Sequence, residues 1–213
     1  MIAASLLFAV TAVFTPPRLV SGEPPGLPPA TVVAGGEVLV EATVDTSGAV
    51  SHAILLRNTP PYGQMVLDAV GRWRFTPAHA PTEDGRDQVV EAVVLVAAVY
   101  RPPTLNNGPT AGTAPLDMSR PSSATPYPVT MPPPVHPIQA AFPGVVLLEV
   151  SLDEAGIARM VRTVRSVPGL DAAARDAVAQ WKFRGASFRA QPVPSTAYVV
   201  VGFPTPTLGA PVQ

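Results

Sequence analysis

Residues 144–203 read GVVLLEVSLDEAGIARMVRTVRSVPGLDAAARDAVAQWKFRGASFRAQPVPSTAYVVVGF. The run from Val145 to Leu152 is mostly apolar, and every second residue from Val146 falls on one face, which predicts a β-strand over residues 145–152. Asp153 and Gly156 begin and end the next four residues. An Asp that caps backbone N–H groups and a Gly that tolerates a positive φ favour a tight turn. The pattern therefore predicts a β-hairpin whose second strand spans about residues 157–164.

A helix is predicted after this hairpin. Asp171 suits the start of a helix, where its carboxylate can accept hydrogen bonds from unpaired N–H groups. From Ala174 to Trp181, apolar residues recur at i, i+3, i+4 and i+7 and form one stripe that can face a sheet. Residues 195–203 are apolar and rich in β-branched side chains, which predicts a final strand. The expected order is hairpin, helix, strand.

Three motifs in this stretch carry a resemblance to a known family. They are V-x-L-x-V-x-L-D-x-x-G from Val146, P-G-L-D-x-A-A-x-x-A-V-x-x-W-x-F from Pro168, and Q-P-V followed by V-V-V-x-F up to Phe203. In this order they resemble the C-terminal domain of the TonB family of energy transducers. The resemblance implies a periplasmic domain that receives a short extended peptide of an outer-membrane receptor.

The same pattern occurs earlier in the chain. A shift of 108 positions aligns residues 36–75 with residues 144–183 without a gap, and the identical residues fall on turns and core positions. They include Glu41/Glu149, Asp45/Asp153, Gly48/Gly156, Trp73/Trp181 and Phe75/Phe183. We therefore expect two tandem TonB C-terminal-like domains, residues 29–100 and 144–204. The expected fold class is α+β, with each domain an antiparallel three-stranded sheet and one packed helix in the order β-β-α-β.

Proline-rich stretches separate these parts. The chain has 28 prolines and no cysteine, so disulfides and thiol chemistry are excluded. Residues 101–143 hold many prolines and few charges, a composition typical of an extended polyproline II spacer. Residues 205–213 form a tail. A net charge of −1 argues against nucleic acid as a partner.

Residues 1–28 are interpreted as an apolar export or anchor segment followed by a proline-rich lead. Residues 1–14 are apolar or small, whereas a helix that crosses a bilayer needs about 20 such residues. An ordinary export signal begins with a positively charged region, but no Lys or Arg precedes Arg18. A cleaved atypical signal, a retained inner-membrane anchor and a buried apolar segment stay open. The first two place the protein in the periplasm, with membrane contact only through residues 1–14.

No constellation for catalysis is expected. His52, His79 and His136 lie in different segments without the spacing of metal ligands. The sequence has no nucleophile elbow and no phosphate-binding loop. We therefore expect no enzyme activity, no catalytic residue, no metal and no cofactor.

The final strand of the second domain is the expected partner-binding site. An apolar strand with an open edge can accept an extended peptide by strand addition. The predicted residues are Thr196, Ala197, Tyr198, Val199, Val200 and Val201. The favoured hypothesis is a TonB-like module that contacts an outer-membrane transporter and takes part in energy-coupled transport. The alternative is a periplasmic scaffold whose domains pair with each other or, as a homodimer, with a second chain.

Overall fold

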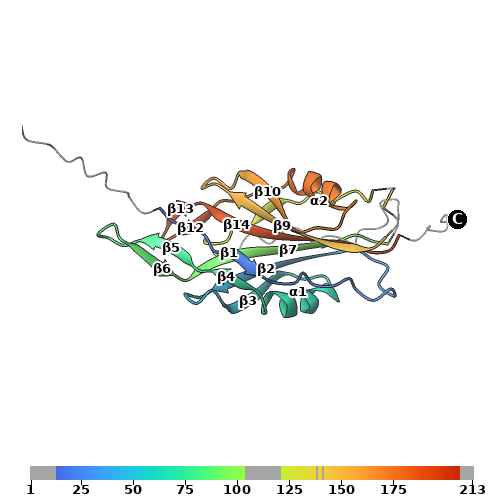
Figure 1. The fold of residues 1–213 in the computed structure, drawn as a ribbon, viewed down its shortest axis with the longest axis horizontal. Helices are drawn as coiled ribbons and strands as arrows, with labels where there is room; N and C mark the ends of the chain where they lie inside the picture. Colours follow the sequence, from blue (N-terminus) through green and yellow to red (C-terminus); the bar gives the residue numbers. More distant parts are fainter. Residues whose placement is uncertain (1–12, 104–120, 138, 141, 207–213) are drawn as a thin grey trace, which may run out of the picture.

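The computed structural model describes residues 13–103, 121–137, 139–140 and 142–206, which are mostly β with two short helices (Figure 1). The elements, in chain order, are β1 (Arg18–Ser21), β2 (Gly36–Val44), β3 (Val50–Arg57), α1 (Tyr62–Val70), β4 (Arg74–Thr76), β5 (Ala78–Pro81), β6 (Asp87–Val90), β7 (Ala92–Tyr100), β8 (Pro128–Thr130), β9 (Gly144–Leu152), β10 (Ala158–Arg165), α2 (Asp171–Val178), β11 (Lys182–Phe183), β12 (Ala186–Phe188), β13 (Gln191–Val193) and β14 (Ser195–Phe203).

One six-stranded sheet organises these elements, in the order β10-β9-β14-β7-β2-β3. The α+β class is confirmed, and each copy contains the expected three strands. They do not form two separate sheets, because β14 pairs in parallel with β7 and joins the copies. The reason is burial: all nine residues of β14 and eight of the nine of β7 are buried. Two strands this apolar are stable only when their neighbours and both sheet faces shield them from water.

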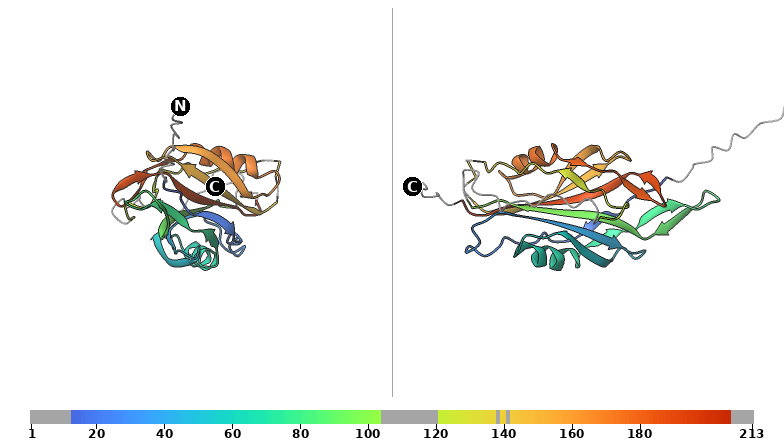
Figure 2. Two further views of the ribbon diagram at one scale, coloured as in Figure 1. Left: turned by 60° about the vertical axis from the view of Figure 1, so that its left-hand side comes forward. Right: turned by 180° about the vertical axis from the view of Figure 1, so that it is seen from behind.

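The two helices cover opposite faces of this sheet (Figures 1 and 2). On β14, Ala197, Val199 and Val201 belong to the core that includes α2. Tyr198 and Val200 point the other way, into the core that includes α1. Each core also takes apolar residues from strands of the other copy, so neither half buries its own sheet alone.

The local geometry of the two copies agrees closely. Asp45 accepts hydrogen bonds from the N–H groups of Ser47 and Ala49, at 2.8 and 3.0 Å. In the second copy, Asp153 accepts equivalent bonds from Ala155 and Ile157, at 3.0 and 2.8 Å. The turn glycines that follow, Gly48 and Gly156, have φ values of +82° and +80°. The expected hairpin turns are therefore present in both halves.

Each copy is preceded by an extended segment that packs on the sheet. Residues 15–26, here the N-terminal arm, contain β1, which pairs with β4. Residues 121–137, here the middle arm, contain β8, which pairs with β11.

The middle arm differs from the solvated spacer expected over residues 101–143. Thr125, Tyr127 and His136 are buried within it. Its proline-flanked carbonyls also accept hydrogen bonds, since Trp181 Nε1 donates to the carbonyl oxygen of Pro132 at 3.1 Å. A proline-rich strand can therefore pack as an extended layer, because it keeps its carbonyl acceptors. Residues 104–120 of the expected spacer lie outside the described residues.

No helix in the described part of the chain is long and apolar enough to cross a membrane. Most of the expected export or anchor segment, residues 1–12, lies outside the described residues. Most of the expected tail, residues 207–213, does so as well.

Candidate functional site

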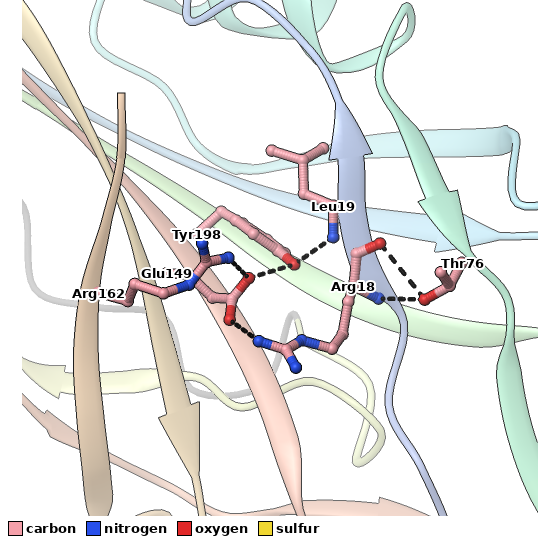
Figure 3. A network of polar contacts seen from close by, with 6 residues as sticks. All are labelled: Arg18, Leu19, Thr76, Glu149, Arg162 and Tyr198. Atoms are coloured by element: carbon pink, nitrogen blue, oxygen red, sulfur yellow. Dashed lines mark hydrogen bonds and ion pairs between the residues drawn. The ribbon is translucent and has the colours of Figure 1, made fainter. Parts of the chain in front are cut away.

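A buried carboxylate lies at the centre of a polar network under the N-terminal arm (Figure 3). The side chain of Glu149, on β9, is only 1% exposed. It accepts hydrogen bonds of 2.8 Å from Arg18 Nη2 and of 2.8 Å from Arg162 Nη2. The hydroxyl of Tyr198, one of the predicted site residues, donates to Glu149 Oε2 at 3.4 Å. The network thus joins the arm, β10 and the central strand β14.

The backbone of the N-terminal arm is fixed at the same place. The N–H of Leu19 donates to Tyr198 Oη at 2.6 Å. The N–H of Arg18 donates to Thr76 Oγ1 at 3.1 Å, within the antiparallel pairing of β1 with β4. The arm therefore touches β4 of the first copy and β9 and β14 of the second, and it bridges the two halves.

The charges in this network shift the pKa values of its members. Burial alone would raise the pKa of Glu149, but the hydrogen bonds and charges of Arg162 and Arg18 together hold it below its usual value. The hydrogen bond and charge of Glu149 raise the pKa of Arg18. Burial, and then the charge of Glu149, raise the pKa of the Tyr198 hydroxyl. At neutral pH the site is an ionised carboxylate held by two cations beside a neutral phenol.

The other end of the arm lies against Trp73. Its indole Nε1 donates to the carbonyl oxygen of Glu23 at 2.9 Å. A Cβ placed on Gly22 would lie 2.5 Å from Trp73 Cδ1, so the arm passes over the indole only with a glycine at this position. The carboxylate of Glu23 forms an ion pair with Arg165 of β10, a second bridge between the copies.

The equivalent site of the first copy has different donors. Glu41, on β2, is 8% exposed and faces the middle arm. Its Oε2 accepts hydrogen bonds from the N–H and the hydroxyl of Ser122, at 3.0 and 2.9 Å, and one from Thr125 Oγ1. Each arm thus crosses to the glutamate of the other copy. The N-terminal arm brings a cation to its glutamate and the middle arm brings hydroxyl groups.

The predicted binding strand lies inside the sheet. Residues 196–201 pair with β9 on one side, and residues 197–201 pair with β7 on the other. All six predicted residues are buried, from Thr196 at 4% exposure to Val201 at 0%. In this arrangement β14 has no open edge, and strand addition along it requires that β7 or β9 leave. Its role in partner binding stays a prediction.

The outer strands of the six-stranded sheet are β3 and β10. These strands are repeat equivalents of each other. His52 on β3 and Met160 on β10 occupy matching positions, and both residues are exposed. Among the described residues, strand addition that leaves this sheet closed would therefore use one of two related edges.

Apart from Tyr198, the sequence did not identify the residues around Glu149. Arg18 lies 131 positions before Glu149, so no local motif joins them. The available signal was a glutamate at the same position of two apolar strands, Glu41 and Glu149, because a charge in such a pattern needs a buried partner.

The histidines do not form a metal site in the described part of the chain. His79 Nδ1 lies 2.7 Å from Asp87 Oδ2, and His136 is buried against Phe203. No group of three or more potential metal ligands occurs among the described residues.

In these features, extended segments of the chain are held on a β-sheet by backbone pairing and a few charges. Residues 134–204 match the family described as the Gram-negative bacterial TonB protein C-terminal. A search of curated proteins finds no match.

The matched residues contain β9, β10, α2 and β14, and they begin ten residues before the predicted start at Gly144. Over this stretch the chain is similar to one TonB C-terminal domain. Domains of this family bind outer-membrane transporters. The match covers one copy, so the assignment of residues 29–100 to the same family is a proposal.

Proposed function

We propose that this protein is a periplasmic TonB-like module that binds an extended segment of an outer-membrane transporter by strand addition and takes part in energy-coupled transport. The match of residues 134–204 to the TonB C-terminal family carries the proposal. The first copy, with the same order of strands and helix, is proposed to be a second domain of this type fused to the first. Residues 1–14 are proposed to connect the module to the inner membrane.

The binding strand of this proposal is Thr196–Val201, and its use requires that the sheet open. Within the closed sheet, β7 occupies one edge of β14 in parallel register from Leu95↔Ala197 to Tyr100↔Gly202. A transporter segment that pairs with this edge must replace β7. A segment that binds without opening the sheet must use β10 or β3.

A reversible disulfide between β7 and β14, here the β7–β14 lock, distinguishes binding along β14 from binding at an outer strand. Val99 and Val201 are directly paired, and the chain has no native cysteine, so Val99→Cys with Val201→Cys can form a single defined disulfide. Directly paired residues of neighbouring strands lie about 5 Å apart, within the range a disulfide spans. The matched control is Ala42→Cys with Ala53→Cys, which joins β2 to β3 and leaves β14 unchanged.

Partner capture is measured by photo-crosslinking in intact cells, with probes at Tyr198, Met160 and His52. Transporter capture that is lost in the oxidised β7–β14 lock and restored by reduction supports binding along β14. Capture from Met160 or His52 that survives the lock assigns binding to an outer edge. Absence of any transporter from all three positions in the unlocked chain contradicts the proposed function.

The scaffold alternative has its own support in the β7–β14 pairing. The structure pairs the two copies within one chain along the strand expected to bind a partner. A pure scaffold keeps its cellular role when β7 and β14 are locked, because the closed sheet is then the functional form. We expect transport to fail in the locked chain and to recover on reduction. Normal transport in the locked chain, together with no transporter capture from Met160 or His52, favours the scaffold.

A further inference from the structure

We propose that the surface under the N-terminal arm is a recognition site for an extended partner segment with the pattern Arg-Leu-x-x-Gly, and that residues 18–22 of the chain occupy it in competition with that partner. The site, here the arm groove, is formed by Trp73, Phe75, Thr76, Glu149 and Tyr198. This inference goes beyond the transporter-binding function and does not depend on it.

The arm sits in the groove as a bound peptide would. Its backbone forms an antiparallel pairing with β4, from Arg18↔Thr76 to Ser21↔Arg74. The N–H of Leu19 leaves that ladder and donates to Tyr198 Oη at 2.6 Å. Main-chain bonds of this kind hold any extended segment, while side-chain contacts decide which segment binds.

Three positions of the arm carry this specificity. Arg18 places its guanidinium 2.8 Å from the carboxylate of Glu149. The side chain of Leu19 packs against the core that contains α1. Gly22 lies over the indole of Trp73, where a Cβ would be 2.5 Å from Cδ1. Val20, between them, is 66% exposed and leaves its position free to vary.

The groove is held in place by residues other than the arm. Arg162 binds Glu149 from β10, and it would keep the carboxylate ionised after Arg18 departs. Tyr198 is fixed by edge-to-face contacts with Trp73 and Phe75, whose ring centroids lie 5.9 and 5.6 Å away. A binding site that is already formed loses little conformational entropy when a partner enters.

One contact of the arm is open to water. The side chain of Arg18 is 58% exposed, so water already competes for its ion pair. The middle arm differs, because the glutamate that it contacts, Glu41, is bound by the hydroxyl groups of Ser122 and Thr125 and not by an arginine of the arm. Recognition of arginine is therefore specific to the groove that contains Glu149.

The test uses the full chain and a labelled peptide with the sequence of residues 15–26, TPPRLVSGEPPG. The chain carries Gly22→Ala, which drives its own arm off Trp73, or Arg18→Ala as a second arm-release variant if the first does not fold. Fluorescence anisotropy measures binding of the peptide, and amide exchange at Leu19 reports arm release. We expect the peptide to bind the arm-released chain at least tenfold more tightly than the wild-type chain, whose tethered arm competes at a high effective concentration.

Matched variants distinguish specific recognition of the arginine from nonspecific binding of the peptide. Glu149→Gln in the arm-released chain is expected to weaken peptide binding several-fold, and Glu41→Gln is expected to leave it unchanged. A peptide with alanine in place of the arginine is expected to bind as weakly as the wild-type peptide binds the Glu149→Gln chain.

Two results would overturn the proposal. The first is fast amide exchange at Leu19 without peptide binding, which would make the arm a structural strand only. The second is binding that is insensitive to Glu149→Gln, which would remove the arginine specificity. Because no transporter is present in this assay, neither result bears on transporter binding.

Discussion

Replacing Glu149 with glutamine should destabilise the protein by an amount that the geometry bounds. Glutamine keeps the shape of the side chain but removes the charge that two arginines share. The two bonds of 2.8 Å, from Arg18 and Arg162, would contribute about 1.5–3 kcal/mol each if they were shielded from water. Their sum is the upper limit of the loss.

Solvent reduces that limit. The side chains of Arg18 and Arg162 are 58% and 46% exposed, so each ion pair falls to about 0.5–1 kcal/mol. The arginines also return to water in the variant, so no buried cation is left unpaired, the situation that makes loss of a buried partner costly. We therefore expect Glu149→Gln to lower the free energy of unfolding by about 1–2 kcal/mol.

Urea unfolding followed by tryptophan fluorescence measures this change, with the same m value in both proteins. Raising the ionic strength from 0.1 to 1 M shortens the screening length from about 10 to about 3 Å, so the difference between the two proteins should shrink. Glu41→Gln is the control, because its donors Ser122 and Thr125 are neutral and a glutamine oxygen can still accept from them. Equal losses in the two variants with equal salt dependence would refute the reasoning.

Three further changes test other parts of the structure. Gly22→Ala places a Cβ against the indole of Trp73 and should drive the arm off it, which amide exchange over residues 18–21 detects and which should cost about 1–3 kcal/mol in urea unfolding. Gly156→Ala, at φ +80° and with its new Cβ 2.6 Å from the carbonyl oxygen of Phe183, should cost about 1–3 kcal/mol, and a neutral result would contradict the turn geometry. The lowered pKa of Glu149 means that its contribution is present above its ordinary value of 4.5 and is lost as pH falls through the lower folded value. The stability gap between wild type and Glu149→Gln should therefore close in acid, which unfolding curves at pH 3 and pH 7 check.

The raised pKa of Tyr198 has the opposite consequence in base. The folded protein favours the neutral phenol, so this contribution is complete below the ordinary pKa of 10.0 and is lost as pH rises toward the folded value. Tyr198→Phe leaves the N–H of Leu19 without its acceptor. It should speed amide exchange at Leu19 while removing this part of the alkaline destabilisation.

The local elements follow closely from sequence patterns. The hairpin strand expected from Val145 to Leu152 is β9, and the final strand expected over residues 195–203 is β14. The helix expected to start at Asp171 is α2, with Ala174, Ala177 and Val178 buried as its stripe predicts. These features rest on interactions between residues close in sequence, which a periodic pattern encodes.

The candidate site follows the sequence only in part. Tyr198 was predicted as a site residue because of its strand, and its hydroxyl does take part in the network. Its strand was expected at an edge, and it lies in the middle of the sheet. An apolar strand has the same sequence pattern whether it pairs with one neighbouring strand or with two. The pattern therefore could not place β14 within the sheet.

The sequence by itself determined the two β-β-α-β repeats, the Asp–Gly turns and the large apolar side chains of each core. Only the tertiary structure decided that β7 and β14 pair, that each arm crosses to the other copy, and that Arg18 meets Glu149. The physical reason is the distance along the sequence between the residues that interact. Turns and helices are set by neighbours a few residues apart, whereas strand pairing and buried ion pairs are selected by what the whole chain must shield from water.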